Sequence, residues 1–257
     1  MTSPDTLPAA VDIRGASKTY PNGTRALEPV DLTVRQGEFV TIVGPSGCGK
    51  STLLRLIAGL SPPTAGNIVL SEGFSPPRLA YVFQSPTLMP WASVQANVRL
   101  PLDLAGTSRA EADEKTRHAL ELVGLQEFAR SFPRELSGGM QMRASIARAL
   151  VTGPRLLLMD EPFGALDEIT RNRLDREFSA LSARENLTVL FVTHSIYEAV
   201  FLSSRVLVMS PRPGRIHAEV AIDAPKARTD SFRGTAEFAT HSARLSEMLG
   251  TEMQEAE

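Results

Sequence analysis

Cysteine is almost absent from the sequence, since Cys48 is the only one among 257 residues. A single cysteine excludes an intramolecular disulfide and a metal site built from several cysteines, and it is typical of a reducing compartment such as the cytoplasm. Long apolar runs are missing as well. The runs at residues 156–159 and 189–192 have the length of strands, and none approaches the ~18 apolar residues that cross a bilayer. We therefore expect any membrane role to depend on a partner.

An excess of either charge is also missing, because 27 lysines and arginines face 29 aspartates and glutamates. Binding to a phosphate backbone requires a basic excess, so nucleic acid is not expected as a primary partner. Residues 1–10 lack the basic start and apolar stretch of a secretory signal, and we expect a disordered lead-in there. With 42% apolar residues, the chain can bury the core of one large or two small domains.

Apolar runs of strand length recur along the chain, most of them bounded by turn residues. They lie at residues 39–43, 79–83, 156–159, 189–193 and 206–209. Helical patterns between several of these runs predict an α/β fold with a mostly parallel central sheet covered by helices on both faces. Residues 11–20 and 30–35 instead alternate apolar with polar residues around a turn, which predicts an antiparallel β flank.

The middle of the chain, residues 85–152, has helical patterns and no strand-like run. Ser108 and Glu111 form a plausible capping box for a helix that ends near Gly124. We interpret this region as a helical subdomain inserted into a core that residues 11–84 and 153–210 form. Residues 211–257 are expected to be a C-terminal extension, with a short strand-like piece, a polar helical pattern and no chemistry that the sequence identifies.

A glycine-rich loop ending in Lys-Ser follows the strand at residues 39–43 and precedes an apolar helix, which is the context that a phosphate loop requires. Its backbone N–H groups and the helix N-terminus can surround phosphate oxygens. Lys50 should reach the β- and γ-phosphates of a nucleotide, and the Ser51 hydroxyl should bind Mg²⁺. The alternative is a simple glycine-rich turn. The residues expected to bind nucleotide here are Gly44, Pro45, Ser46, Gly47, Cys48, Gly49, Lys50, Ser51 and Thr52.

Two carboxylates, Asp160 and Glu161, end the apolar run at residues 156–159. Ligands of open α/β sheets bind at this edge, beyond the carboxyl ends of the strands. We expect Asp160 to hold Mg²⁺, directly or through water, and Glu161 to orient and polarise the attacking water. An acidic strand end facing solvent is the alternative, which the nearby phosphate loop makes less attractive.

A second glycine turn, Leu-Ser-Gly-Gly-Met-Gln at residues 136–141, opens another helix and offers a second anion-binding N-terminus. One nucleotide does not need two such ends from one chain, and a lone Ser-Gly-Gly is merely a helix cap. Here the sequence resembles the ABC ATPase family of phosphate-loop (P-loop) NTPases, whose Leu-Ser-Gly-Gly-Gln signature it matches with Met140 in place of the glutamine. In that family the signature of one subunit closes over ATP held by the other. The resemblance implies ATP and Mg²⁺ as ligands, a second ATPase subunit, and nucleotide contacts from Ser137, Gly138 and Gly139.

The resemblance, which covers roughly residues 11–210, gives roles to further positions. Gln84 matches the glutamine that senses Mg²⁺ and the transmembrane partner, and His194 matches the switch histidine that contacts the γ-phosphate. Asp167 matches the aspartate that communicates across the dimer, and Tyr20 matches the aromatic that stacks on adenine. Taken alone, each is a weak signal: a histidine at a strand end is commonly a surface residue, and Tyr20 could be an ordinary strand aromatic.

The implied fold is a RecA-like ATP-binding core with the helical signature subdomain inserted. The sequence shows no fused membrane helices, coiled-coil interruption or second cassette, so it is similar to the ATPase subunit of a bacterial importer. Such a subunit hydrolyses ATP at the cytoplasmic face of the inner membrane, bound peripherally to permease subunits and served by a solute-binding protein. The partner cassette could be an identical copy or a paralogue. The rival hypothesis is a non-transport ABC ATPase, a regulatory or nucleic-acid-linked module that works without membrane subunits.

Three stretches, residues 86–91, 162–167 and 210–215, resemble the nitrate, sulfonate and taurine importer group, which also includes transporters of thiamine-precursor pyrimidines. Leu88, Met89 and Trp91 could form an apolar docking site for a permease, or Trp91 could pack inside the helical subdomain. Cys48 lies near a helix N-terminus, which favours a thiolate, although a small filler residue is the simpler interpretation.

Overall fold

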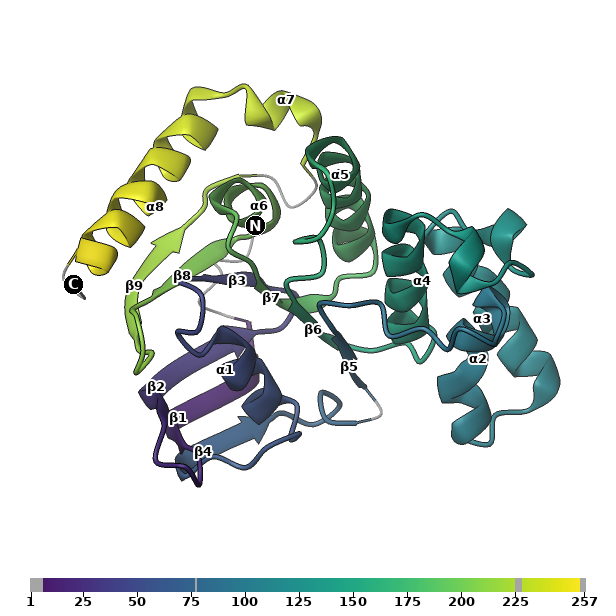
Figure 1. The fold of residues 1–257 in the computed structure, drawn as a ribbon, viewed down its shortest axis with the longest axis horizontal. Coiled ribbons are helices and arrows are strands. Elements are labelled where there is room, and N and C mark those ends of the chain that lie inside the picture. Colours follow the sequence, from purple (N-terminus) through teal and green to yellow (C-terminus); the bar gives the residue numbers. More distant parts are fainter. Residues whose placement is uncertain (1–6, 77, 225–227, 255–257) are drawn as a thin grey trace.

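Two sheets and a group of helices make up residues 7–76, 78–224 and 228–254, the part of the chain that the computed structural model describes (Figure 1). The smaller sheet has three strands in the order β2-β1-β4. The larger has six in the order β5-β6-β7-β3-β8-β9. The mostly parallel sheet, the antiparallel flank and the inserted helices that the sequence predicts are all confirmed.

The three-stranded sheet is antiparallel and consists of β1 (Ala9–Thr19), β2 (Arg25–Arg35) and β4 (Ala65–Leu70). Alternate residues of β1 and β2 are buried, as their binary pattern requires. The expected disordered lead-in is wrong at its end, because Ala9 pairs with Arg35 and Ala10 is fully buried. Residues 1–6 lie outside the described part. Strand β4 is not predicted from the sequence, because its side chains are largely exposed.

The six-stranded sheet holds the runs that the sequence marks as buried strands. Its members are β3 (Phe39–Val43), β5 (Leu79–Val82), β6 (Leu156–Asp160), β7 (Thr188–Val192), β8 (Arg205–Met209) and β9 (Ile216–Ala221). The pairs from β5 to β8 are parallel, and β9 is antiparallel to β8. Because parallel strands end at the same edge, the loops that follow β3, β6 and β7 share one edge of the sheet.

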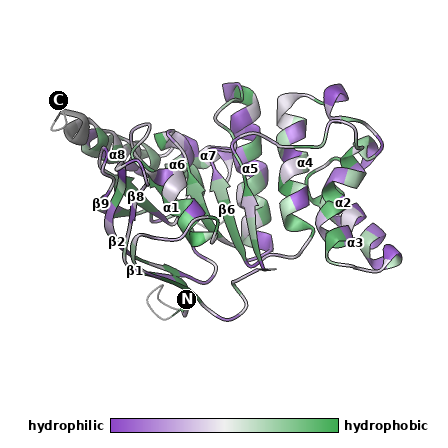
Figure 2. Cartoon of the chain, turned by 60° about the horizontal axis from the view of Figure 1, so that its bottom comes forward, coloured by the Kyte–Doolittle hydropathy of each residue, from purple (hydrophilic) through white to green (hydrophobic). Residues whose placement is uncertain are grey.

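Helix α1 (Lys50–Ile57) lies between the two sheets, and α5 (Glu168–Arg184) and α6 (Ile196–Leu202) cover the opposite face (Figure 1). The aromatic rings of Phe39, Phe163, Phe178 and Phe191 pack against one another beneath α5. Figure 2 shows α4 and α5 carrying both hydrophobic and hydrophilic residues, as helices with one buried side do.

The inserted region forms a helical group at one end of the molecule (Figure 1). It contains α2 (Val94–Leu104), α3 (Arg109–Leu122), α4 (Gly138–Leu150) and the 3₁₀ turns η2 (Gln126–Phe128) and η3 (Pro133–Glu135). Ser108 caps α3 as predicted, because its hydroxyl accepts a hydrogen bond from the Glu111 amide at 3.4 Å.

The C-terminal region continues the fold with β9, α7 (Asp230–Arg233) and α8 (Ala236–Gln254). The pairing of β9 with β8 places it within the main sheet, beyond the boundary that we expected at residue 210. Phe238 and Leu245 of α8 are buried. Among the described helices, none has the length and apolar character needed to span a membrane.

Candidate functional site

The phosphate loop connects β3 to α1 and depends on two glycines in the left-handed region, Gly47 (φ 77°) and Gly49 (φ 110°). A Cβ atom on Gly49 would lie 2.7 Å from the Leu27 side chain and 2.8 Å from the Ala26 carbonyl oxygen. Only glycine fits there, since both the backbone angle and the space exclude a side chain. The loop therefore holds its backbone in the sharp curve that the first turn of α1 continues.

Lys50 lies inside this curve and is almost fully buried. Its ammonium donates hydrogen bonds to the carbonyl oxygens of Gly44 at 2.8 Å and Pro45 at 2.9 Å, and it lies 3.9 Å from the Glu161 carboxylate. A buried ammonium needs such partners. This arrangement holds a positive charge at the centre of the loop, where phosphate oxygens can replace the two carbonyls.

Ser51 and Asp160 meet where α1 begins and β6 ends. The Ser51 hydroxyl donates to the Asp160 carboxylate at 2.6 Å, and the Tyr81 hydroxyl donates to its other oxygen at 3.0 Å. Burial, with the nearby Asp160 charge, raises the pKa of Tyr81, which keeps the phenol a donor. Hydroxyl and carboxylate oxygens are ligands that suit Mg²⁺. No group of three or more His, Cys, Asp or Glu side chains gathers to hold a metal in the described ranges, so a Mg²⁺ here would need phosphate oxygens or water to complete its shell.

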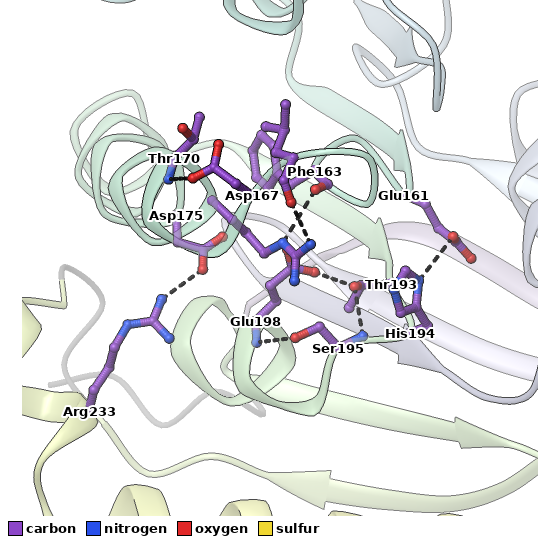
Figure 3. Close-up of polar contacts among 12 residues, drawn as sticks. Glu161, Phe163, Asp167, Thr170, Asp175, Thr193, His194, Ser195, Glu198 and Arg233 are labelled. Atoms are coloured by element: carbon purple, nitrogen blue, oxygen red, sulfur yellow. Dashed lines mark hydrogen bonds and ion pairs between the residues drawn. The ribbon is translucent and has the colours of Figure 1, made fainter. Parts of the chain in front are cut away.

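Glu161 and His194 face each other across the ends of β6 and β7 (Figure 3). His194 Nδ1 lies 3.2 Å from the Glu161 carboxylate. Glu161 has a φ of 46°, an unusual value for a residue with a side chain, which it shares with Thr87 and Asn186. The side chain of Glu161 is 20% exposed and that of His194 is 54% exposed. The pair is therefore accessible from the same side as the phosphate loop.

The signature residues lie elsewhere, at the start of α4 in the helical group, well separated from α1 in both views (Figures 1 and 2). Ser137 caps α4 by accepting from the Met140 amide at 3.3 Å, and Gly138 is exposed. A Cβ atom on Gly139 would lie 2.8 Å from Thr170, so this glycine permits close packing on α5. The N-termini of α1 and α4 thus lie apart within one chain (Figures 1 and 2).

The remaining predicted residues flank these centres. The Asp167 carboxylate caps α5 by accepting from the Thr170 amide at 3.0 Å, and this bond lowers the pKa of Asp167 (Figure 3). Gln84 follows β5 and is exposed. The Tyr20 hydroxyl lies 3.3 Å from the Thr52 hydroxyl of α1, and the Lys18 ammonium lies 5.5 Å from the centre of its ring.

The burial of two apolar residues distinguishes between the alternatives that the sequence leaves open for them. Cys48 is fully buried, and burial raises the pKa of its thiol, so a thiolate is disfavoured despite the adjacent helix N-terminus. Trp91 does not pack inside the helical group, because it is 76% exposed. This exposure favours the alternative in which Trp91 is part of a docking site for a permease.

Gly214 is a further residue of this site, one that the sequence does not indicate, and it lies against the phosphate loop. A Cβ atom on it would lie 1.9 Å from the Cys48 carbonyl oxygen. Its backbone also bridges to β2, because its amide donates to Ala26 at 3.0 Å and its carbonyl accepts from the Glu28 amide at 2.9 Å. The stretch at residues 210–215 is notable in the sequence only for its family resemblance. Nothing in the spacing of its residues indicates a contact with a loop so distant in the sequence.

Comparison with known proteins adds a family match to this geometry. The model of the ABC transporter family matches residues 27–164, which is more than half of the chain. Among solved structures, the fold is similar to a dimeric bacterial ABC transporter cassette, with a TM-score of 0.73 and 33% identity over 84% of this chain and 100% of that one. It is also similar to a dimeric post-hydrolysis state of a cassette bound to ADP and Pi, with a TM-score of 0.72 and 32% identity over the same shares.

Several curated proteins are similar over most of their length. The aliphatic sulfonates import ATP-binding protein of Rhodopseudomonas palustris is 46% identical over 93% of this chain and 82% of its own. The nitrate import ATP-binding protein of Synechocystis is 44% identical over 90% of this chain and 91% of its own. The taurine import ATP-binding protein of Rhizobium johnstonii is 48% identical over 79% of each chain.

Proposed function

This chain belongs to the ABC transporter family of ATP-hydrolysing proteins, and on that premise we propose that it is the ATPase subunit of an importer. The observation that carries the proposal is the convergence of Lys50, Ser51, Asp160, Glu161 and His194, from α1 and the ends of β6 and β7, at one edge of the sheet. These are the groups that hold phosphates, position a metal and orient a water molecule.

In the proposed reaction, the phosphates of ATP enter the phosphate loop and Lys50 exchanges its bonds to Gly44 and Pro45 for phosphate oxygens. Glu161 orients and polarises the attacking water, and His194 holds both Glu161 and the γ-phosphate in register. Ser51, Asp160 and Gln84 would hold Mg²⁺, which would neutralise charge on the phosphates. Tyr20 and Thr52 lie together at 3.3 Å, where the ring can stack on adenine.

A second cassette completes each site in this proposal. Ser137, Gly138 and Gly139 open α4, and the exposed position of Gly138 leaves this N-terminus free to meet a phosphate on another subunit. Asp167 starts α5 beside the Glu161 loop and contacts the partner cassette. Two ATP molecules would thus be held between two phosphate loops and two signature helices, and their binding and hydrolysis would close and reopen the dimer.

The permease is proposed to dock on the helical group near Gln84. Trp91 exposes 76% of its surface there, beside the half-buried Leu88 and Met89, and an exposed large aromatic is typical of a binding anchor. Docking there would place the chain peripherally at the cytoplasmic face of the inner membrane. The relatives named for sulfonates, nitrate and taurine have similar identities, 44–48%, so we propose a small nitrate-, sulfonate- or taurine-type solute as the cargo.

The substitution Glu161→Gln tests the catalytic part. Glutamine keeps the size and a hydrogen-bond acceptor but removes the base, so ATP should still bind while hydrolysis falls by about 10²-fold or more. Isothermal titration with ATP and steady-state phosphate release measure the two effects. Glu177→Gln is the matched control, because Glu177 is a helix α5 carboxylate that pairs with surface Arg173. Normal turnover by Glu161→Gln would refute the role of Glu161.

The substitution Trp91→Ala tests the importer part. It should reduce co-purification with the permease and leave ATP affinity unchanged, since Trp91 is 76% exposed in the segment before α2 and is not part of the phosphate loop. Leu104→Ala is the control, because Leu104 is equally exposed (79%) at the other end of α2. Equal recovery of the permease with both variants would contradict the docking site. A thermal-shift screen of the associated solute-binding protein with nitrate, alkanesulfonates, taurine and pyrimidines would identify the cargo.

A further inference from the structure

Arg171, one turn into α5, reaches back to the loop that links Glu161 to α5. Its Nη2 donates to the Leu166 carbonyl at 2.8 Å and its Nε donates to the Phe163 carbonyl at 3.3 Å. The planar guanidinium presents its donors in a fixed fork, so it holds both carbonyls in one geometry. The loop that begins at Glu161 is therefore fixed at two points by a single side chain.

The same guanidinium also contacts Glu198 of α6, the helix that follows the His194 loop. Arg171 Nε lies 3.5 Å from Glu198 Oε1, and only 3% of the Glu198 side chain is exposed. The other carboxylate oxygen accepts a hydrogen bond from the Thr193 hydroxyl, which in turn accepts from the Ser195 amide at 3.0 Å (Figure 3). Thr193 and Ser195 are the two neighbours of His194, so Glu198 fixes this loop on both sides of the histidine.

The two loops meet where Glu161 and His194 lie 3.2 Å apart. Both side chains are partly exposed, and Glu161 keeps its unusual φ of 46°. Backbone in such a conformation persists only where the surroundings determine it. Arg171 of α5 and Glu198 of α6 are the charged pair that is linked to both loops, and these two helices cover the sheet face opposite α1 (Figure 1).

We propose that Arg171 and Glu198 are positioning residues for ATP hydrolysis, which together hold the Glu161 loop and the His194 loop in register. Neither side chain touches the phosphate loop in the described contacts, so the pair acts through Glu161 and His194. This inference rests on the proposed catalytic roles of those two residues. Because a displacement of about 1 Å in a reacting group can cost up to about 10²-fold in rate, loosening the pair should affect turnover far more than nucleotide binding.

The surroundings of Glu198 predict a characteristic pH dependence. Asp175 and Arg171 face it from α5, Arg233 from α7 and Thr193 from the end of β7. Burial, strengthened by the Asp175 charge, raises the pKa of Glu198 to about 7, and Arg171 and Arg233 lower it. Burial also raises the pKa of Asp175 to about 6. When Glu198 takes up a proton below neutrality, its ion pair with Arg171 is lost.

The test measures kcat, KM for ATP and the pH profile of kcat for the full chain and its variants. Arg171→Met keeps the apolar stem, and it should lower kcat about tenfold or more with KM changed less than about twofold. Arg171→Lys should recover part of the loss, because lysine restores the charge opposite Glu198 without the fork. Glu198→Gln and Arg171→Met should both lower kcat at neutral pH and flatten the acid limb, because neither variant has an ion pair that protonation of Glu198 can break. Arg173→Met is the control on the same helix, since Arg173 pairs with Glu177 on the surface.

The inference is overturned if Arg171→Met matches Arg173→Met in kcat, or if the acid limb stays as steep as in the wild type in both Arg171→Met and Glu198→Gln. A loss of kcat that Arg171→Lys does not relieve, with an equal rise in KM, also overturns it, because that pattern indicates general disruption. The variant Glu161→Gln distinguishes failure of the positioning role from failure of the proposed function. If Glu161→Gln is inactive while Arg171→Met is normal, only the positioning role fails, whereas a fully active Glu161→Gln removes the catalytic assignment itself.

Discussion

Gly214 supports the phosphate loop from behind although it lies more than 160 residues away in the sequence. Gly214→Ala would place a methyl group 1.9 Å from the Cys48 carbonyl oxygen and 2.8 Å from the Met209 side chain. The backbone oxygen cannot yield without moving the loop. We therefore expect the free energy of unfolding to fall by about 1–3 kcal/mol and ATP to bind more weakly.

Denaturant unfolding and ATP titration measure the two effects of Gly214→Ala. Gly234→Ala is the control, because a Cβ atom there would lie 3.6 Å from the Ser231 carbonyl oxygen, an ordinary contact. Wild-type stability and ATP affinity in Gly214→Ala would show that the loop does not depend on this contact.

Glu198 should make the protein less stable as the pH rises. Its pKa is about 7 in the folded chain and 4.5 as the ordinary value, so the folded state binds the proton more tightly than the unfolded state. The free energy of unfolding therefore declines as the pH rises from about 4.5 to about 7, and the loss is complete above that range. Glutamine stays neutral throughout, so the free energy of unfolding of Glu198→Gln should not show this decline. As the pH rises from 5 to 8, the variant should therefore gain on the order of 2 kcal/mol in unfolding free energy relative to the wild type.

Urea unfolding of both proteins at pH 5 and pH 8 measures this gain. A stability difference that does not change with pH would mean that Glu198 titrates at its ordinary value. The expected gain in stability accompanies an expected change in the pH profile of turnover, so charge on Glu198 favours catalysis at the expense of stability.

Helix α7 is joined to α5 by a buried ion pair, Arg233 with Asp175, at 2.7 Å (Figure 3). The Arg233 guanidinium also lies over the Phe201 ring, 4.0 Å from its centre. Arg233→Met leaves Asp175 buried without its cation. Asp175 can take up a proton because its pKa is already raised to about 6, so the expected loss is about 1–3 kcal/mol at neutral pH, below the usual cost of breaking a buried pair.

The pair formed by Arg176 and Asp230 provides the control for this link. It joins the same two helices, but both side chains are largely exposed, at 46% and 60%. Arg176→Met should therefore change the free energy of unfolding by less than about 1 kcal/mol. Equal losses in the two variants, measured by urea unfolding at pH 7, would contradict the assigned importance of the buried pair.

The elements that the sequence predicted well are those whose signal is local. β6 and β7 are continuous apolar runs and are buried throughout, and Ser108 shows its cap within one turn of α3. β4 was missed because its residues are mostly exposed and its stability comes from pairing with β1. Gly66 in β4 lies so near β1 that a Cβ atom would fall 2.1 Å from the Gly15 carbonyl oxygen, a constraint that only the folded chain reveals.

The residues of the candidate site also fall into two groups, those with a local sequence signal and those without one. Lys50 and Ser51 belong to a contiguous motif, and Asp160 and Glu161 end a recognisable strand, so the sequence alone indicated them. Arg171 and Glu198 carried no such signal, because they come together only when α5 packs beside α6. The raised pKa of the Cys48 thiol could not be predicted either, since it depends on burial rather than on the helix N-terminus.

The molecule as a whole holds its phosphate loop and its signature residues in different places. The phosphate loop with Glu161 and His194 lies at the edge of the six-stranded sheet, and the signature lies at the start of α4 in the helical group (Figure 1). A single chain cannot bring both to one ATP without separating α4 from α5, against which Gly139 packs. Two chains arranged head to tail can, which is why we propose that each ATP site is shared between two chains.

Mixing two inactive variants tests this shared site most directly. Lys50→Met removes the phosphate-loop cation, and Gly138→Asp puts a negative charge at the N-terminus of α4, where it is compatible with the helix but repels phosphate. A Cβ atom on Gly138 meets only the Leu166 side chain, at 3.7 Å, so the fold should tolerate it. In a mixed dimer, the intact phosphate loop of one chain faces the intact signature of the other.

The measurement is the ATPase rate of each folded variant alone and of an equimolar mixture. We predict negligible rates for the separate variants and recovery of a clear fraction of the wild-type rate on mixing. If the mixture forms dimers but stays as inactive as its components, each site is built within one chain and the shared-site account is wrong.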